Sequence, residues 1–210
     1  MSKEARPEIP RKTVYRLSIY LRCLQRVKTN GIRTVSSEAL AKAAGVKSAQ
    51  LRKDLTYFGQ FGTRGLGYDV ELLEKMISQL LGTSSLQPVI LVGVGNLGTA
   101  LLSYQGFQQE GFEILAAFDL EPERLKSKSL PRPIHGMSEL PNFLREHPVR
   151  MAIVAVPGPA AQAVVNTLVE NGIAGILNFS PAVLQVPDEV IVNNVNLAIE
   201  LENLSYFVRG

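Results

Sequence analysis

Three glycines that follow an apolar run carry the clearest chemical signal in the sequence. The stretch from Pro88 to Leu102 reads PVILVGVGNLGTALL, in which Gly93, Gly95 and Gly98 have the spacing GxGxxG. This spacing predicts a dinucleotide cradle between a strand and a helix. Gly93 permits a tight turn, Gly95 lets the backbone approach a pyrophosphate, and Gly98 lets the helix pack closely on the sheet. The helix amino terminus would offer unpaired N–H groups to the phosphates.

An acidic residue stands where the adenine ribose of such a cofactor is expected. Ile114 to Phe118 has the pattern of a second buried strand, and Asp119 ends it, 21 residues beyond Gly98. A carboxylate there binds the ribose hydroxyls and repels a 2′-phosphate, which favours NAD over NADP. The alternative is that Asp119 only caps the helical turn that follows it.

Two proline-containing segments, AVPGP (155–159) and LNFSP (177–181), follow later strands. Ligands of open α/β sheets bind at the carboxyl ends of strands, although prolines also occur there for purely topological reasons. The residues predicted to bind NADH or NAD are Gly93, Val94, Gly95, Asn96, Leu97, Gly98, Asp119, Val156, Pro157, Asn178, Phe179 and Ser180.

Groups suited to proton transfer are scarce near this predicted site. The two histidines are His135 and His147, and from Met151 to Asn193 there is no Lys, Arg, His or Tyr. A dehydrogenase needs such a group at bonding distance from its substrate. We therefore expect no catalytic residue and a cofactor that is sensed and not turned over. Cys23 is the only cysteine, which excludes an internal disulfide or a cysteine-cluster metal site, and no metal is expected.

The amino-terminal part has the spacing of a helix-turn-helix in VSSEALAKAAGVKSAQLRKDLTYFG (35–59). Ser36 and Ser48 are candidate helix caps, and Gly45 supplies the turn between the helices. In the second helix Leu51, Leu55 and Phe58 share one face, so the polar side chains project from the other. A face with Gln50, Arg52, Lys53 and Tyr57 suits a major groove, in which Gln50 can pair with adenine.

The first 82 residues and the rest of the chain carry opposite net charges. Residues 1–82 hold 15 Lys or Arg and 7 Asp or Glu, a net +8, whereas residues 83–210 hold 7 and 12, a net −5. Arg64, at the tip of GTRGLG, would sit on a small wing and enter a narrow minor groove or hold phosphate. The asymmetry indicates a polyanion for the first part. The alternative is an ordinary helical cluster with a solvated basic face.

The elements that must position these residues form two domains separated by the linker GTSSLQ (82–87). Helices are expected at 11–28, 37–44, 48–58 and 69–81 before the linker, and at 97–109, 138–146, 159–171 and 196–207 after it. Strands are expected at 89–92, 114–118, 151–156, 175–178 and 190–192. The fold class is thus α/β, with a helix-turn-helix domain at 1–82 and a Rossmann-like, doubly wound parallel sheet at 83–210.

The chain is expected to be cytoplasmic and not bound to a membrane. The first residues, MSKEARPEIPRK, are charged and precede no apolar leader segment. No apolar run approaches the roughly 20 residues that a membrane span needs.

Taken together, these segments resemble the Rex family of bacterial redox-sensing transcriptional repressors. The resemblance covers nearly the whole chain, through RKTVYRLSIYLRCL, SAQLRKDLTYFGQFGTRGLGYDV, GVGNLGTAL and ILNFSP. It implies a homodimeric winged-helix repressor that NADH releases from operator DNA and that NAD leaves bound. It also implies a carboxy-terminal helix exchanged between subunits. The DNA-binding residues that it implies are Lys47, Ser48, Gln50, Arg52, Lys53, Tyr57 and Arg64.

Three further expectations concern assembly and switching. The apolar helix at 196–207 must dock either on a second subunit or on its own domain, and a two-fold dimer would bind a palindromic operator. Arg16 and Asp188 are a conjectured charge pair that forms in only one state. The rival hypotheses are a small NAD-dependent oxidoreductase and a constitutive DNA-binding protein with a degenerate nucleotide fold.

Overall fold

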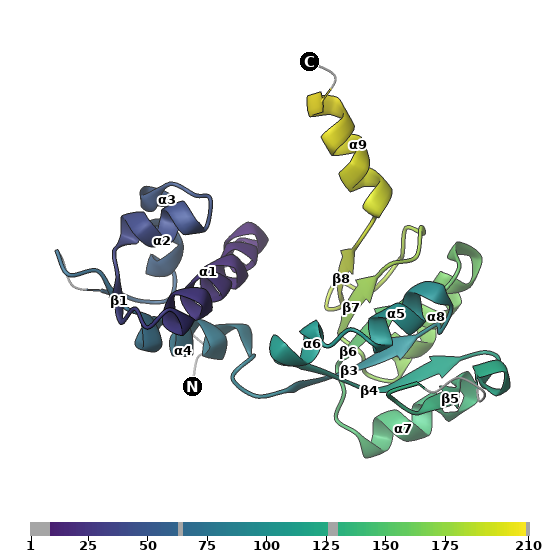
Figure 1. Ribbon diagram of the computed structural model, residues 1–210. Helices are drawn as coiled ribbons and strands as arrows, with labels where there is room; N and C mark the ends of the chain where they lie inside the picture. Colours follow the sequence, from purple (N-terminus) through teal and green to yellow (C-terminus); the bar gives the residue numbers. More distant parts are fainter. Residues whose placement is uncertain (1–8, 63–64, 126–129, 209–210) are drawn as a thin grey trace. The chain divides into compact units, whose positions relative to one another are not determined.

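The computed structural model in Figure 1 describes residues 9–62, 65–125 and 130–208. The chain divides into two compact units, one ending at Ser85 and one beginning at Leu86, close to the expected linker. No helix in these described ranges is long and apolar enough to cross a membrane.

The first unit consists of helices and one small antiparallel pair of strands. The helices are α1 (Arg11–Thr29), α2 (Ser37–Ala43), α3 (Ser48–Thr56) and α4 (Val70–Leu81), and the strands are β1 (Thr34–Val35) and β2 (Tyr68–Asp69). Local chemistry sets these boundaries. Ser36 caps α2 by accepting from Ala39 N, and Asp69 caps α4 by accepting from Leu72 N. Gly82 ends α4 in the left-handed conformation.

The core of this unit confirms the expected inward face of α3. Leu51 and Leu55 are buried with Leu17, Tyr20 and Leu40, and Phe58 packs half-buried against the same cluster. The helix-turn-helix and the β1–β2 pair together form a winged-helix arrangement. The strands of the wing are short and were not expected from the sequence, because two residues give no readable alternation.

The second unit is a six-stranded parallel sheet in the order β5-β4-β3-β6-β7-β8. Along the chain the first strand lies in the middle, the next two lie on one side of it, and the last three lie on the other, which is the Rossmann order. The strands are β3 (Gln87–Val92), β4 (Phe112–Asp119), β5 (Ile134–Gly136), β6 (Met151–Val154), β7 (Gly175–Asn178) and β8 (Ile191–Asn194).

Both faces of this sheet are covered, which explains why its central strand is continuously apolar. Ile90 and Val92 of β3 pack in one buried cluster, and Val89 and Leu91 pack in another on the opposite face. The helices of this unit are α5 (Asn96–Leu102), α6 (Gly106–Gln109), α7 (Leu140–Glu146), α8 (Gly158–Glu170) and α9 (Leu197–Val208).

The expected helix at 97–109 is wrong, because the structure has two helices there. The break follows Leu102, where the Tyr104 ring lies against Gly106, and a Cβ on that glycine would come within 2.3 Å of the ring. The strand β5 was also not expected. Its three residues are too few for periodicity to reveal them.

The last helix, α9, extends beyond β8 in Figure 1 and has no buried residue. Its large apolar side chains are all more than half exposed, including Leu201 at 66% and Phe207 at 79%. Apolar side chains gathered at this density on one helix are unusual for a free surface.

Candidate nucleotide and nucleic-acid sites

A cavity of about 440 Å³ lies beside the carboxyl ends of β3, β4 and β6, where the order of the strands reverses. It brings together most of the residues that the sequence predicts for the cofactor. Its lining consists of Val92, Gly93, Gly95, Asn96, Leu97, Asp119, Leu120, Met137, Ala155, Val156, Pro157, Ala160, Val164 and Phe179. The position agrees with the rule that open α/β sheets bind ligands at this switch point.

The three glycines of the motif have three different geometries. Gly93 has a φ of +94°, and a Cβ there would lie 2.6 Å from Ala155 O. A Cβ at Gly98 would lie 1.9 Å from Gly93 O, so α5 can approach the loop only with glycine at this position. A Cβ at Gly95 would meet nothing within 4 Å. The protein itself therefore does not require glycine at 95, and the open space above it fits a ligand that contacts the backbone.

Asp119 holds the glycine loop as well as the turn that follows it. Its Oδ2 accepts a hydrogen bond from Val94 N at 2.7 Å, and its Oδ1 accepts from Glu121 N at 3.0 Å. The capping alternative is therefore present in the structure, and it coexists with a position on the cavity wall. A neighbouring cavity of about 320 Å³ is lined by Val94, Gly95, Asp119, Glu121, Arg124 and Leu125.

Four predicted cofactor residues, Val94, Gly98, Asn178 and Ser180, do not line the 440 Å³ cavity. Asn178 is fully buried, and its Nδ2 donates to Asn194 Oδ1 at 2.8 Å and to Ser180 O at 3.2 Å. Its Oδ1 accepts from Ser180 N at 2.9 Å. These bonds shape the loop after β7, and that loop brings Phe179 to the cavity.

Several lining residues were missed by sequence reasoning. Met137 follows β5, which is too short to recognise, so nothing in the sequence aligned it with the other strand ends. Leu120 directly follows Asp119, and Ala160 lies three residues after Pro157, just past the segment AVPGP. Continuing these segments by one helical turn would have found both.

Neither histidine lines the cavity. His135 Nδ1 lies 3.2 Å from Glu139 Oε2, and its ring contacts Phe118 and Phe143. His147 stacks on Phe143 with ring centroids 4.1 Å apart. Among the lining residues, Asp119 is the single ionisable side chain, and both of its oxygens already accept backbone hydrogen bonds.

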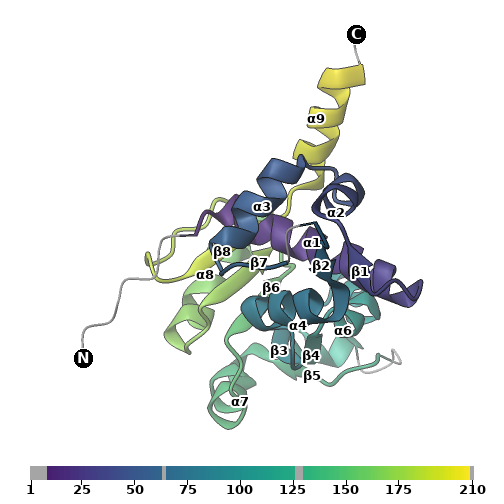
Figure 2. The same cartoon turned by 90° about the vertical axis from the view of Figure 1, so that its left-hand side faces the viewer.

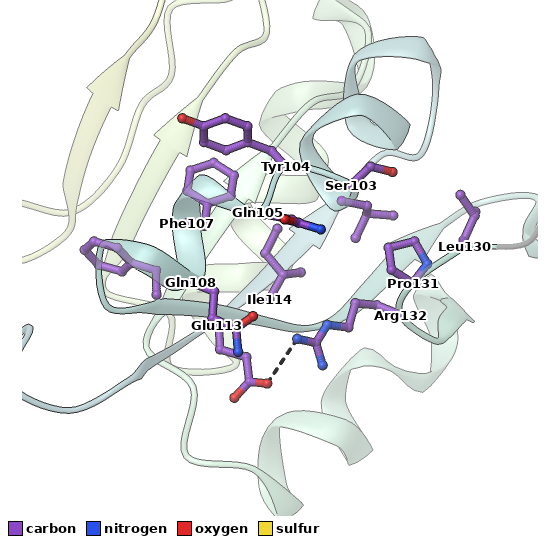
Figure 3. A pocket seen from close by; sticks show the side chains of 12 residues that line it. Ser103, Tyr104, Gln105, Phe107, Gln108, Glu113, Ile114, Leu130, Pro131 and Arg132 are labelled. Atoms are coloured by element: carbon purple, nitrogen blue, oxygen red, sulfur yellow. Dashed lines mark ion pairs between the residues drawn. The ribbon is translucent and has the colours of Figure 1, made fainter.

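A separate cavity of about 460 Å³ lies near the amino end of β4, opposite the strand ends that carry the cofactor residues (Figure 3). The ring of Tyr104 and the ion pair between Glu113 Oε1 and Arg132 Nη2, at 3.1 Å, are among its lining groups. None of the predicted site residues lines it.

In the first unit, α2 and α3 lie side by side in both views (Figures 1 and 2). Lys47, Arg52 and Lys53 are exposed, whereas Ser48, Gln50 and Tyr57 are partly buried. Arg52 Nη1 donates to Ser37 Oγ at 3.2 Å, across the two helices. Arg64 lies outside the described residues.

Asp54, on the inner face of α3, joins that helix to α1. Its carboxylate is fully buried and accepts from Arg16 Nε at 2.6 Å, Arg16 Nη2 at 2.7 Å, Tyr20 Oη at 2.8 Å, Gln50 Nε2 at 2.9 Å and Thr13 Oγ1 at 3.2 Å. Burial acts to raise the pKa of Asp54, but the hydrogen bonds from Arg16, Tyr20 and Gln50 outweigh it, and the net pKa is lowered. Burial and the bond to Asp54 raise the pKa of Tyr20.

Sequence reasoning missed this cluster, although a signal was available. Asp54 occupies the apolar face between Leu51 and Phe58, and an acid at a core position must be paired. Arg16 was instead conjectured to pair with Asp188. In this structure its guanidinium bonds Asp54, within its own unit.

Comparisons with known proteins cover both units of the chain. The family model described as "Putative DNA-binding protein N-terminus" matches residues 8–56, and the model described as "CoA binding domain" matches residues 84–182. A relative from Pelotomaculum thermopropionicum is 46% identical over 95% of this chain and 93% of its own length, and it is named redox-sensing transcriptional repressor Rex.

Two solved structures resemble the chain over nearly its full length. RSP in complex with β-NAD⁺ and operator DNA matches with a TM-score of 0.88 and 34% identity, over 95% of this chain and 92% of that one. RSP in complex with β-NADH matches with a TM-score of 0.84 and 32% identity, over 96% and 94%.

Proposed function

The chain belongs to the Rex family of redox-sensing transcriptional repressors, and we propose that its amino-terminal unit binds operator DNA until NADH occupies its Rossmann unit. The family is one of regulators and not of enzymes, and its structures hold NAD⁺ with operator DNA, or NADH. The observation that carries the proposal is the union, in one chain, of a basic winged helix and a dinucleotide cavity whose described lining includes no His, Lys or Tyr.

The DNA-binding face that we propose consists of α3 and the wing. Lys47, at the start of α3, and Arg52 and Lys53, within it, are exposed, so their cations can reach phosphates. A cavity of about 430 Å³ beside Arg52 is lined by Ser36, Ser37 and residues of the wing, including Gly62 and Gly67. Arg64, outside the described residues, is proposed to bind in the minor groove.

The residues of the 440 Å³ cavity fit a dinucleotide. The open space at Gly95 leaves room for a pyrophosphate at the start of α5, and the Asp119 carboxylate stands one loop away, where it can accept from ribose hydroxyls. Arg124 and Glu121 border the neighbouring cavity and are proposed to flank the adenosine end. Asn178 and Ser180 are proposed to act through the loop that they fold.

The far end of the cavity favours the reduced cofactor. Ala155, Val156, Pro157 and Phe179, which follow β6 and β7, line this end with apolar atoms, whereas the single carboxylate of the cavity, Asp119, ends β4 on the other side of β3. The nicotinamide ring is neutral when reduced and cationic when oxidised, so desolvation at an apolar wall disfavours the oxidised ring. A ligand shifts a two-state equilibrium only through such a difference in affinity.

The protein is proposed to act as a homodimer in the cytoplasm, where its DNA lies. The apolar side chains of α9 are exposed along the whole helix, and a second subunit would cover them. A two-fold dimer presents two α3 helices and therefore requires a palindromic operator. A pair of Arg16 with Asp188 is proposed for one of the two states, and Arg16 bonds Asp54 through Nε and Nη2 in this structure.

The experiment is an operator titration at fixed salt over a range of NADH to NAD ratios. Affinity that falls as the ratio rises supports the sensor. Affinity independent of the ratio contradicts it and favours constitutive binding, whereas turnover of NADH with a carbonyl substrate, abolished by replacing His135, favours an oxidoreductase. Coenzyme A, which contains an adenosine diphosphate group but no nicotinamide, is the control ligand. If coenzyme A released the operator, the nicotinamide would not be needed for release.

A further inference from the structure

Gln50 has two neighbours of different kinds, Asp54 on its inner side and, in the proposed function, DNA on its outer side. Its Nε2 lies 2.9 Å from Asp54 Oδ1, one helical turn along α3. The nitrogen and the oxygen of an amide have similar shapes, so its orientation has to be argued from hydrogen-bond chemistry. Here the hydrogen-bond chemistry of Asp54 allows only one orientation of the amide.

Asp54 can only accept hydrogen bonds. Its side chain is 1% exposed and is held by both Nε and Nη2 of Arg16, a forked geometry typical of an ionised carboxylate. The hydroxyl of Tyr20 also donates to it. An amide oxygen turned toward this carboxylate would place two acceptors in contact, so the Gln50 nitrogen must face inward.

We propose that Asp54 is a positioning residue for base recognition: it fixes the polarity of the Gln50 amide, so that Gln50 presents its carbonyl oxygen to the major groove. Adenine N6 and cytosine N4 donate in that groove, whereas guanine O6 and thymine O4 accept. Gln50 therefore selects a base with an amino group. This inference depends on the proposed function, because it requires α3 to enter the groove.

Four variants of the full-length chain test the proposal. Asp54→Asn removes the charge and one acceptor oxygen and frees the Gln50 amide to turn. Gln50→Ala removes the reading group, and the double variant combines both changes. Glu74→Gln is the matched control, because it removes a carboxylate that pairs with Lys28 on the exposed side of the same unit. Each variant is measured on operators selected from a randomised duplex pool, with every base pair substituted in turn.

The wild-type chain and Glu74→Gln should prefer adenine or cytosine over guanine or thymine at one position of each half-site, by roughly tenfold for one hydrogen bond. Gln50→Ala should lose the preference at that position alone. Asp54→Asn should reduce the same preference to about twofold or reverse it. In the Gln50→Ala background, Asp54→Asn should leave the base profile unchanged, because Asp54 acts through Gln50.

Three results would overturn the proposal. The first is a wild-type profile for Asp54→Asn, and the second is a preference for guanine or thymine at the position that Gln50→Ala relaxes. The third is an equal change of profile by Asp54→Asn with and without Gln50, which would indicate a displaced helix. If the chain selects no duplex from the pool, the proposed function fails as well, which separates that failure from the other three.

A measurement on the wild-type chain tests the proposal even if the Asp54→Asn variant does not fold. The side-chain amide of Gln50 should have an NMR order parameter close to that of rigid backbone, about 0.85, in the absence of DNA. The exposed amide of Gln60 serves as the mobile comparison. A Gln50 order parameter below about 0.6 would mean that Asp54 does not hold the amide, and the proposal would be wrong.

Discussion

Alanine substitutions at two glycines of the same motif should have opposite consequences. At Gly98 a Cβ would lie 1.9 Å from Gly93 O, whereas ordinary contact begins at 3.4 Å, so backbone must move by about 1.5 Å. Overpacking of this kind costs about 1 to 3 kcal/mol of unfolding free energy. For a chain of this size a loss of about 2 kcal/mol lowers the Tm by roughly 4 to 8 °C. Gly98→Ala should therefore destabilise the protein with or without cofactor.

At Gly95 a Cβ meets no protein atom within 4 Å, and φ is −71°. Alanine is a poorer helix cap than glycine, but it also lowers the entropy of the unfolded chain, and each effect is at most about 1 kcal/mol. The Tm of the ligand-free variant should thus stay close to that of the wild type. The new methyl group would instead occupy the space in which the pyrophosphate is proposed to lie.

Thermal unfolding with and without NADH measures both effects. At an NADH concentration of about 100 times the wild-type Kd, the wild type gains roughly 2.7 kcal/mol. If Gly95→Ala weakens binding by about 100-fold, its gain falls to about 0.4 kcal/mol. A full gain for Gly95→Ala would refute the idea that the cofactor contacts this backbone, and a wild-type Tm for Gly98→Ala would refute the close approach of α5 to the loop.

Three further predictions concern DNA binding, assembly and pH. Lys53→Ala should lower the slope of log affinity against log salt by about one unit, and an unchanged slope would show that Lys53 touches no phosphate. Leu201→Glu on α9 should convert the proposed dimer to monomers in sedimentation equilibrium without changing the helix content measured by circular dichroism, whereas an unchanged molar mass would place the interface elsewhere. The pKa of Tyr20 is raised by burial and by Asp54, so the stability that it supplies is complete below the unfolded pKa of about 10 and is lost as pH rises above it. The pKa of Asp54 is lowered, so its contribution is present above about pH 4 and is lost as pH falls below that value. Because only the wild type can lose the contribution of Tyr20, the difference in unfolding free energy between the wild type and Tyr20→Phe, measured by denaturant titration, should be smaller at alkaline pH than at neutral pH.

The sequence by itself determined the elements whose signals are local. GxGxxG after an apolar run, an acid at the end of the next strand, and the i, i+4, i+7 spacing of Leu51, Leu55 and Phe58 are all readable because the residues that cooperate are close along the chain. These signals were enough to predict the α/β class, the helix-turn-helix and most of the cavity wall.

Only the tertiary structure decided which distant groups meet. Asp54 lies 38 positions from Arg16 and 34 from Tyr20, and no periodicity connects an acid on one helix with partners on another. Met137 reaches the cavity because β5 adds to the sheet beside β4, although β5 itself has only three residues. The amide of Asn178 could hydrogen-bond a cofactor, but in the folded chain it is buried and bonds neighbouring residues of its own loop instead. Residue type states what a side chain can bind, and packing decides what it does bind.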